Sequence, residues 1–201
     1  ISYAADWMEY SGHRPDDGGG DLLFQLDPLW AHPDIGFVGI NQFAPMSDWR
    51  DGREHRDGLE GWPSSYDQAY LQSNIEGGEG FDWTYATAAD RETQIRTPIE
   101  DPAHGKPWVF RPKDLRSWWS NPHYDRPGGV EAAAPTAWVP RSKPIVFTGF
   151  GCPAIHRGTN QPDAQLDRKA DGFAVPYFSR GWRDDAIQRA ALEAVVSYWA
   201  D

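Results

Sequence analysis

Apolar and polar stretches alternate along the chain in a way that predicts buried strands separated by long helix-bearing segments. Apolar runs without helical period lie at residues 1–6, 35–43 and 143–148, and their length suits strands that are buried on both faces. Residues 108–111 are consistent with a further short strand. We therefore expect three or four strands.

Helical spacing of apolar residues is clearest in residues 184–199, which open with two aspartates that suit a helix N-terminus. Residues 64–74 and 82–96 also predict helices, the second with an aspartate at its start and a Thr-Pro pair as its stop. Residues 114–119 suit one helical turn. The helices at 64–74, 82–96 and 114–119 lie between predicted strands, whereas residues 184–199 close the chain.

This order of elements indicates an α/β fold in which helical crossovers join parallel strands. A closed eight-stranded barrel needs about 250 residues, whereas this chain has 201 residues and only three or four predicted strands. We expect a single domain, residues 1–201, that forms the C-terminal portion of a partial (β/α)₈ TIM-like barrel and is a fragment of a larger protein.

The composition of the chain limits the kinds of molecule that it is expected to bind and the kinds of protein that it can be. The net charge of −11 and the pI near 4.9 disfavour a broad surface for nucleic acid or an anionic membrane. No apolar run is long enough to span a membrane. The single cysteine, Cys152, cannot form an internal disulfide, and no histidine is placed to activate it, so a buried, inert thiol is expected.

Tryptophan is abundant, with 11 residues among 201. A core of this size holds only part of that number, so some tryptophans are expected at a surface, where their faces can stack on sugar rings. Trp7, Trp49, Trp118 and Trp119 are the candidates for such platforms. Packing in the core or under loops is the competing interpretation for each.

Several segments resemble known barrels. YAADWMEY, DIGFVGINQFAPMSDW and KPIVFTGFGCPA resemble the barrel of clan A glycoside hydrolases, especially the endo-mannanase-like branch. GKPWVFRPKDLRSWWSNPHYDRPGGV, APTAWVPRSKPI, GTNQPD and RGWRDDAIQR resemble the TIM-barrel-like domain in large tail proteins of gene transfer agents and related phages. The second resemblance spans nearly the whole chain, and it implies that the predicted strands are the fifth, sixth and seventh of the barrel.

The resemblance to clan A implies an active site at the C-terminal ends of the strands. In such retaining enzymes a glutamate that follows a threonine at the end of the seventh strand attacks the anomeric carbon. Here Thr148 is followed by Gly149, which has no side chain to form the covalent intermediate. Catalysis through this position is therefore excluded. The sequence is also compatible with a glycine that was introduced to trap a substrate.

Other carboxylates follow the predicted strands. Glu9 and Asp48 are the candidates for a nucleophile in an active enzyme, and Asp6 lies beside Glu9 at the end of the first strand. Binding of sugar hydroxyls, or ion pairing with arginines such as Arg50, are the alternatives for all three. Asn41 stands where the family more often has aspartate, and this difference removes a further negative charge from the expected pocket.

The expected binding residues share a position at a strand end or on the Trp-rich segment that precedes the last strand. They are Asp6, Trp7, Tyr10, Asn41, Gln42, Phe43, Trp49, Trp118, Trp119, Asn121 and Tyr124. His123 and Asp125 are too few ligands for a metal ion. We expect neither a metal nor a cofactor.

The favoured hypothesis is a glycoside-hydrolase-like domain in the tail tip or hub of a phage-like particle, which is assembled in the cytoplasm and acts at the surface of the recipient cell. Its expected partners are cell-envelope carbohydrate and other tail or baseplate proteins, and its catalysis is expected to be impaired. An active retaining hydrolase acting on a polysaccharide and a purely structural tail domain are the alternatives.

Overall fold

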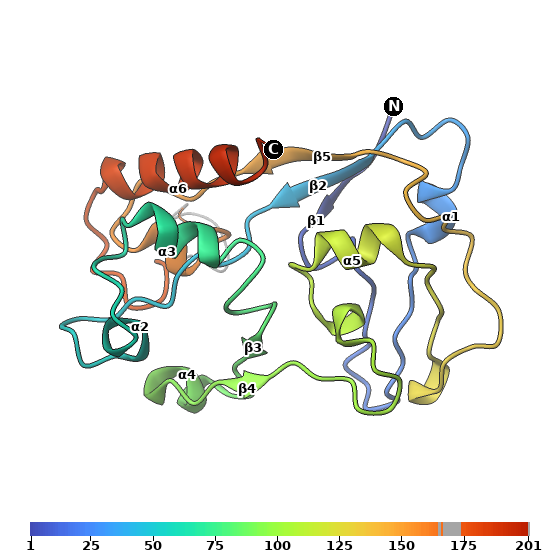
Figure 1. Ribbon diagram of the computed structural model, residues 1–201, viewed down its shortest axis with the longest axis horizontal. Coiled ribbons are helices and arrows are strands. Elements are labelled where there is room, and N and C mark those ends of the chain that lie inside the picture. The colour runs from blue at the N-terminus through green and yellow to red at the C-terminus, as the bar shows by residue number, and fades with distance from the viewer. Residues whose placement is uncertain (165, 167–173, 201) are drawn as a thin grey trace. The chain divides into compact units, whose positions relative to one another are not determined.

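The computed structural model describes residues 1–164, 166 and 174–200. The chain divides into two compact units. Unit 1 consists of Ile1–Gln42 and Glu100–Gly149, and unit 2 consists of Phe43–Ile99 and Phe150–Asp201. Figure 1 labels the helices and strands of both units.

Unit 1 carries a three-stranded sheet in the order β1-β2-β5. The strands are β1 (Ala4–Asp6), β2 (Val38–Gln42) and β5 (Ile145–Phe150), of which only the last residue belongs to unit 2. β1 and β2 run parallel (Figure 1), which confirms the α/β class. All three main predicted strands are confirmed, although the described strands do not close into a barrel.

The helices of unit 1 are short: α1 (Asp27–Trp30), α5 (Leu115–Ser120) and the 3₁₀ helices η1 (Pro107–Phe110) and η2 (Pro127–Gly129). The prediction of a strand at residues 108–111 is wrong. Pro107 occupies the first turn of η1, where its fixed φ favours a helix and its missing N–H group is not needed. The predicted turn at 114–119 is confirmed as α5.

Aromatic rings fill the core of unit 1 around His123, which is fully buried. Its ring stacks on Phe24 with centroids 4.4 Å apart and on Trp138 at 5.5 Å. Its Nδ1 lies 2.9 Å from Asp27 Oδ2, and its Nε2 lies 2.8 Å from the carbonyl oxygen of Trp118. Both ring nitrogens are therefore engaged inside the protein.

Unit 2 contains the longest helix, α6 (Asp185–Tyr198), which packs against α3 (Gln68–Ser73). The side chain of Asp184 caps α6 by accepting a hydrogen bond from the backbone N–H of Ile187 at 3.1 Å. Three alanines of α6 are buried, and their small side chains allow neighbouring segments to approach closely. This helix and its acidic start are confirmed.

The prediction of one helix at residues 82–96 is wrong. The segment instead forms β3 (Trp83–Thr84) and α4 (Ala88–Thr93), and it is followed by β4 (Thr97–Pro98), which pairs antiparallel with β3. The Thr87 hydroxyl caps α4 by accepting from the backbone N–H of Asp90, and Gln94 ends it in the left-handed conformation with φ of 53°. The remaining elements of unit 2 are α2 (Arg56–Leu59) and η3 (Gly158–Asn160).

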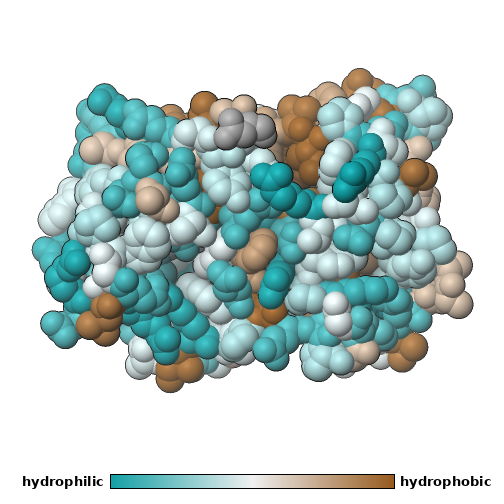
Figure 2. All heavy atoms as spheres, viewed as in Figure 1, coloured by the Kyte–Doolittle hydropathy of each residue, from teal (hydrophilic) through white to brown (hydrophobic). Residues whose placement is uncertain are grey.

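On the face seen in Figure 2, hydrophilic and weakly hydrophobic residues predominate, and hydrophobic residues form smaller patches among them. No helix within the described residues is long and apolar enough to cross a membrane.

Candidate functional site

Polar side chains gather on one face of the sheet in unit 1, at the carboxyl ends of its strands. Asp6 of β1 lies opposite Asn41 of β2 in the parallel register. On the other side of β2, the Thr148 hydroxyl of β5 donates a hydrogen bond to Asn41 Oδ1 at 2.9 Å. Asp6 and Thr148 are exposed, and Asn41 is half-buried. The three side chains form a polar, solvent-accessible group, called here the strand-end face.

Gly149 lies inside β5, whereas the sequence suggested that the strand stops at Thr148. Because side chains alternate along a strand, a side chain at 149 would point to the opposite side of the sheet from Thr148 and Asn41. Gly149 is not among the glycines with positive φ, so its backbone conformation does not require glycine. Gly149 therefore supplies no carboxylate, and any side chain at this position would point away from the strand-end face.

Glu9 follows β1 by one turn and is half-buried. Its carboxylate accepts hydrogen bonds from the Tyr3 hydroxyl at 2.9 Å and from the backbone N–H of Asp6 at 3.1 Å. The hydrogen bond and the negative charge of Glu9 raise the pKa of Tyr3. Asp6 in turn accepts from the backbone N–H of Met8 at 2.9 Å. Both carboxylates thus help to shape the turn that ends the strand.

Most of the aromatic candidates in unit 1 are buried. Trp7 is 8% exposed, Tyr10 is 2% exposed and Trp118 is 1% exposed. The Tyr10 hydroxyl donates to the carbonyl of Pro112 at 2.6 Å, and its ring meets Trp118 edge-on at 5.1 Å. Burial favours the packing interpretation for these three. Trp119 is half-buried, so part of its ring reaches solvent.

Three further candidates in unit 1 are half-buried: Gln42, Asn121 and Tyr124. Gln42 Oε1 is buried with no hydrogen-bond donor in reach among the described residues. Asn121 donates to the carbonyl of Ser117 at 2.8 Å, and the Lys106 ammonium lies 4.8 Å from the Tyr124 ring centroid. Gln42 Oε1 is therefore an unsatisfied buried acceptor.

The other predicted residues, Phe43, Asp48 and Trp49, belong to unit 2. Phe43 is half-buried, and Trp49 is 9% exposed and packs edge-on against His55 and Tyr70. The backbone of Trp49 exchanges two hydrogen bonds with the Asn160 side chain, each 3.0 Å long. These contacts fix Trp49 as part of the unit 2 core.

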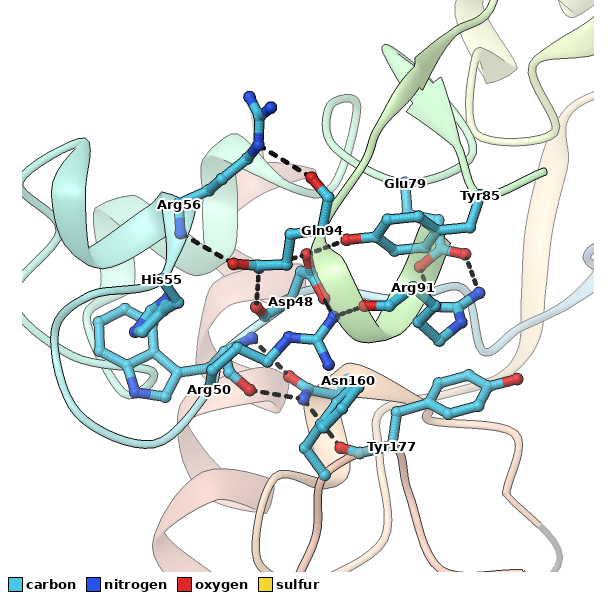
Figure 3. A network of polar contacts seen from close by, with 12 residues as sticks. Asp48, Arg50, His55, Arg56, Glu79, Tyr85, Arg91, Gln94, Asn160 and Tyr177 are labelled. Carbon is cyan, nitrogen blue, oxygen red and sulfur yellow. Dashed lines mark hydrogen bonds and ion pairs between the residues drawn. The ribbon is translucent and has the colours of Figure 1, made fainter. Parts of the chain in front are cut away.

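Asp48 is the centre of a buried polar network in unit 2 (Figure 3). Its Oδ1 accepts from Arg50 Nη2 at 2.8 Å. Its Oδ2 accepts from the Tyr85 hydroxyl at 2.5 Å, Gln94 Nε2 at 2.8 Å and Arg96 Nη2 at 3.0 Å. With four donors on two oxygens and two guanidinium partners, this carboxylate is an ion-paired structural centre.

The network continues from Arg50 to a second ion pair, between Arg91 and Glu79. Arg50 Nη2 also donates to the carbonyl of Arg91 at 2.7 Å, and Arg91 forms a bidentate ion pair with Glu79 at 2.6 and 2.8 Å. The Arg91 guanidinium lies 4.0 Å from the ring centroid of Tyr177 and 4.6 Å from that of Tyr85 (Figure 3). Aromatic rings and carboxylates together compensate the desolvation of these cations.

The hydroxyls and guanidinium around Asp48 keep their protons. Burial, followed by the hydrogen bond to Asp48, raises the pKa of Tyr85 to about 12. Burial alone would lower the pKa of Arg96, but the charge and hydrogen bond of Asp57 raise it above its usual value. Each group therefore stays a hydrogen-bond donor at neutral pH.

The whole chain, residues 1–201, matches the family model of the GTA TIM-barrel-like domain, where GTA denotes gene transfer agent. The chain belongs to this family. No curated protein matches it. The family assignment confirms the resemblance to the gene transfer agent domain and its TIM-barrel-like character, and it fits a phage-like particle.

In this GTA TIM-barrel-like domain, sequence reasoning found Asp48 and its partner Arg50 but missed the other members of the network. Tyr85, Gln94 and Arg96 lie 37 to 48 positions away from Asp48. The sequence held only a weak signal, the two arginines that flank the segment RETQIR. Nothing local indicated that Arg96 pairs with Asp48 or that Arg91 pairs with Glu79.

The domain shows no group of three or more metal-ligating side chains within its described residues. His123, one member of the pair that the sequence offered, is bound to Asp27 and to a backbone carbonyl. Asp125 accepts from the backbone N–H of Phe24 at 2.7 Å. Cys152 is buried, and burial raises its pKa to about 12, which agrees with the expected inert thiol.

Proposed function

We propose that this domain contacts cell-envelope carbohydrate as part of the tail of a gene transfer agent particle and does not cleave the glycosidic bond. The family supplies the particle context. The choice of carbohydrate rests on the strand-end face, where Asp6, Asn41 and Thr148 present one carboxylate, one amide and one hydroxyl. Such groups exchange hydrogen bonds with sugar hydroxyls, and this mixture suits a neutral ligand.

The absence of cleavage rests on one observation above all, the saturation of Asp48. A nucleophile needs a carboxylate oxygen that is free to attack the anomeric carbon, and the oxygens of Asp48 accept four hydrogen bonds in a buried network. Gly149 offers no carboxylate. Glu9 accepts from Tyr3 and from the backbone of Asp6. No described carboxylate among these candidates suits double displacement.

The test uses the full-length protein that contains this domain. We expect glycan arrays and calorimetry with envelope polysaccharides to detect saturable binding, and we expect the double change Asn41→Ala, Thr148→Val to weaken it. Asp34→Ala is the matched control because Asp34 is exposed and precedes β2 at its other end. Absence of binding would overturn the proposal and leave a purely structural tail domain.

Reducing-end assays on mannan, peptidoglycan and capsular polysaccharides test the second part of the proposal, that the domain does not cleave the glycosidic bond. We expect no release of reducing ends above that of a buffer blank. Turnover that is abolished by Glu9→Gln or Asp48→Asn would identify an active retaining hydrolase and overturn the proposal. Thermal unfolding of both variants separates a loss of chemistry from a loss of fold.

A further inference from the structure

Unit 2 contains a pocket of about 490 Å³ that none of the sequence-predicted site residues lines. Its walls come from α2, α3 and the paired strands β3 and β4, with their flanking loops. The lining residues that carry the argument are Asp57, Trp62, Tyr70, Asn74, Trp83 and Arg96. Its volume is within the range of small-ligand sites in proteins.

Two half-buried tryptophans line this pocket, and each is held in place by a neighbour. The Trp62 ring packs against Tyr70 with centroids 5.4 Å apart. The Arg96 guanidinium lies 4.2 Å from the ring centroid of Trp83. Rings that are already fixed lose little conformational entropy when a ligand packs against them. Flat aromatic surfaces of this kind favour the C–H faces of a sugar ring.

The polar groups of the pocket are preorganised by hydrogen bonds. Asp57 accepts from the Tyr70 hydroxyl at 2.8 Å and from Arg96 Nη2 at 2.6 Å. Asp57 and Tyr70 are buried, and burial raises the pKa of Tyr70 well above its usual value, so the hydroxyl remains protonated. Arg96 Nε is buried with no acceptor in reach among the residues that the structure describes. It is therefore an unsatisfied buried donor.

The charges around the pocket are nearly balanced. Asp57, Glu60 and Asp82 oppose Arg56 and Arg96, which leaves an excess of one negative charge. The whole chain carries a net charge of −11. An anionic ligand would be repelled on approach, and the balanced interior does not select a strongly cationic one. A neutral ligand with several hydroxyl groups fits both the charge and the aromatic walls.

We propose that this pocket in unit 2 binds one or two neutral sugar residues of the glycan, with Trp62 and Trp83 as the surfaces against which the sugar packs. The inference rests on the proposed carbohydrate contact and adds a second binding site to the strand-end face.

The test titrates mannobiose, cellobiose and di-N-acetylchitobiose into the full-length protein and follows binding by ligand-observed NMR. We expect at least one disaccharide to bind, and we expect Trp62→Ala and Trp83→Ala each to weaken that binding by about tenfold or more. Trp182→Ala is the matched control because Trp182 is 52% exposed in unit 2 and does not line the pocket. Trp62→Phe and Trp83→Phe keep a ring in place and should restore most of the binding.

The outcomes separate this inference from the proposed function. If the Trp62 and Trp83 variants are folded and bind as the wild type does, while Asn41→Ala, Thr148→Val loses binding, the pocket is not a sugar site and the proposed function stands. If the wild type binds envelope polysaccharide but none of the neutral disaccharides, the pocket inference is overturned. If the wild type binds no carbohydrate at all, both fail.

Discussion

Thr148 and Asn41 are joined side chain to side chain across neighbouring strands, with Thr148 Oγ1 donating to Asn41 Oδ1 at 2.9 Å. This contact orients the end of β5. It turns Thr148 toward the face that also carries Asp6, and it therefore turns position 149 away from that face. The impaired catalysis that we propose from glycine at 149 thus has a second, geometric reason.

A glutamate introduced at position 149 should not restore hydrolysis. Gly149→Glu supplies the missing carboxylate, but the strand presents it on the side of the sheet opposite Asn41. Reducing-end release from mannan and peptidoglycan by the full-length variant should stay at the level of the wild type. Clear turnover by the variant would mean that β5 is oriented differently, and Gly149→Gln, which has the same size without the nucleophile, is the control.

Asp48 should matter for stability. Asp48→Asn removes the counter-charge of two buried guanidinium groups, and breaking a buried pair in this way costs about 3–5 kcal/mol of unfolding free energy. Tyr85→Phe removes one neutral donor from the same carboxylate and should cost only about 1 kcal/mol. Urea unfolding measures both. Equal small losses would show that Asp48 is solvated and available for another role.

The sequence predicted the elements whose signals are local. The three strands were recognisable because each is a continuous apolar run, and α6 because its apolar stripe follows an aspartate that caps it. Residues 82–96 were misread because their composition suits a helix. The hydroxyl of Thr87 and the left-handed Gln94 limit that helix to α4.

The candidate sites were only partly visible in the sequence. The strand ends located Asp6 and Asn41, since parallel strands place their carboxyl ends at one edge. The pocket of unit 2 was not predicted because Trp62, Trp83 and Arg96 come from separate segments of the chain without a common motif. Burial of Trp118 could not be distinguished from exposure, because neighbouring tryptophans on a short helix face different sides.

Cys152 should be unreactive in the folded protein. Burial raises the pKa of its thiol to about 12, and almost no thiolate exists at pH 8. Ellman's reagent should therefore label the native protein at pH 8 far more slowly than the protein in concentrated urea. Rapid labelling without denaturant would show that the segment after β5 opens readily.

His55 should make unfolding free energy depend on pH. Burial lowers its pKa, and its Nδ1 accepts from the backbone N–H of Gly58 at 3.3 Å at the start of α2. The unfolded chain therefore binds the proton more readily than the folded chain, so stability is complete above about pH 6.5 and falls as the pH drops below it.

The matched variant is His55→Asn, which keeps an N-terminal cap without a titrating ring. Urea unfolding of wild type and variant at pH 7.5 and pH 5 should give a smaller pH difference for the variant. A variant with the same pH dependence as the wild type would show that other groups control it.

The central claim, binding of carbohydrate without cleavage, is tested most directly by calorimetric titration of the full-length protein with purified envelope polysaccharide. Binding gives heats that saturate, whereas hydrolysis gives a heat flow that continues after each injection. We predict saturable heats that return to the baseline and that decrease in Asn41→Ala, Thr148→Val. An absence of heat, together with no displacement of a labelled polysaccharide, would contradict the account, and so would continuing heat flow that Glu9→Gln abolishes.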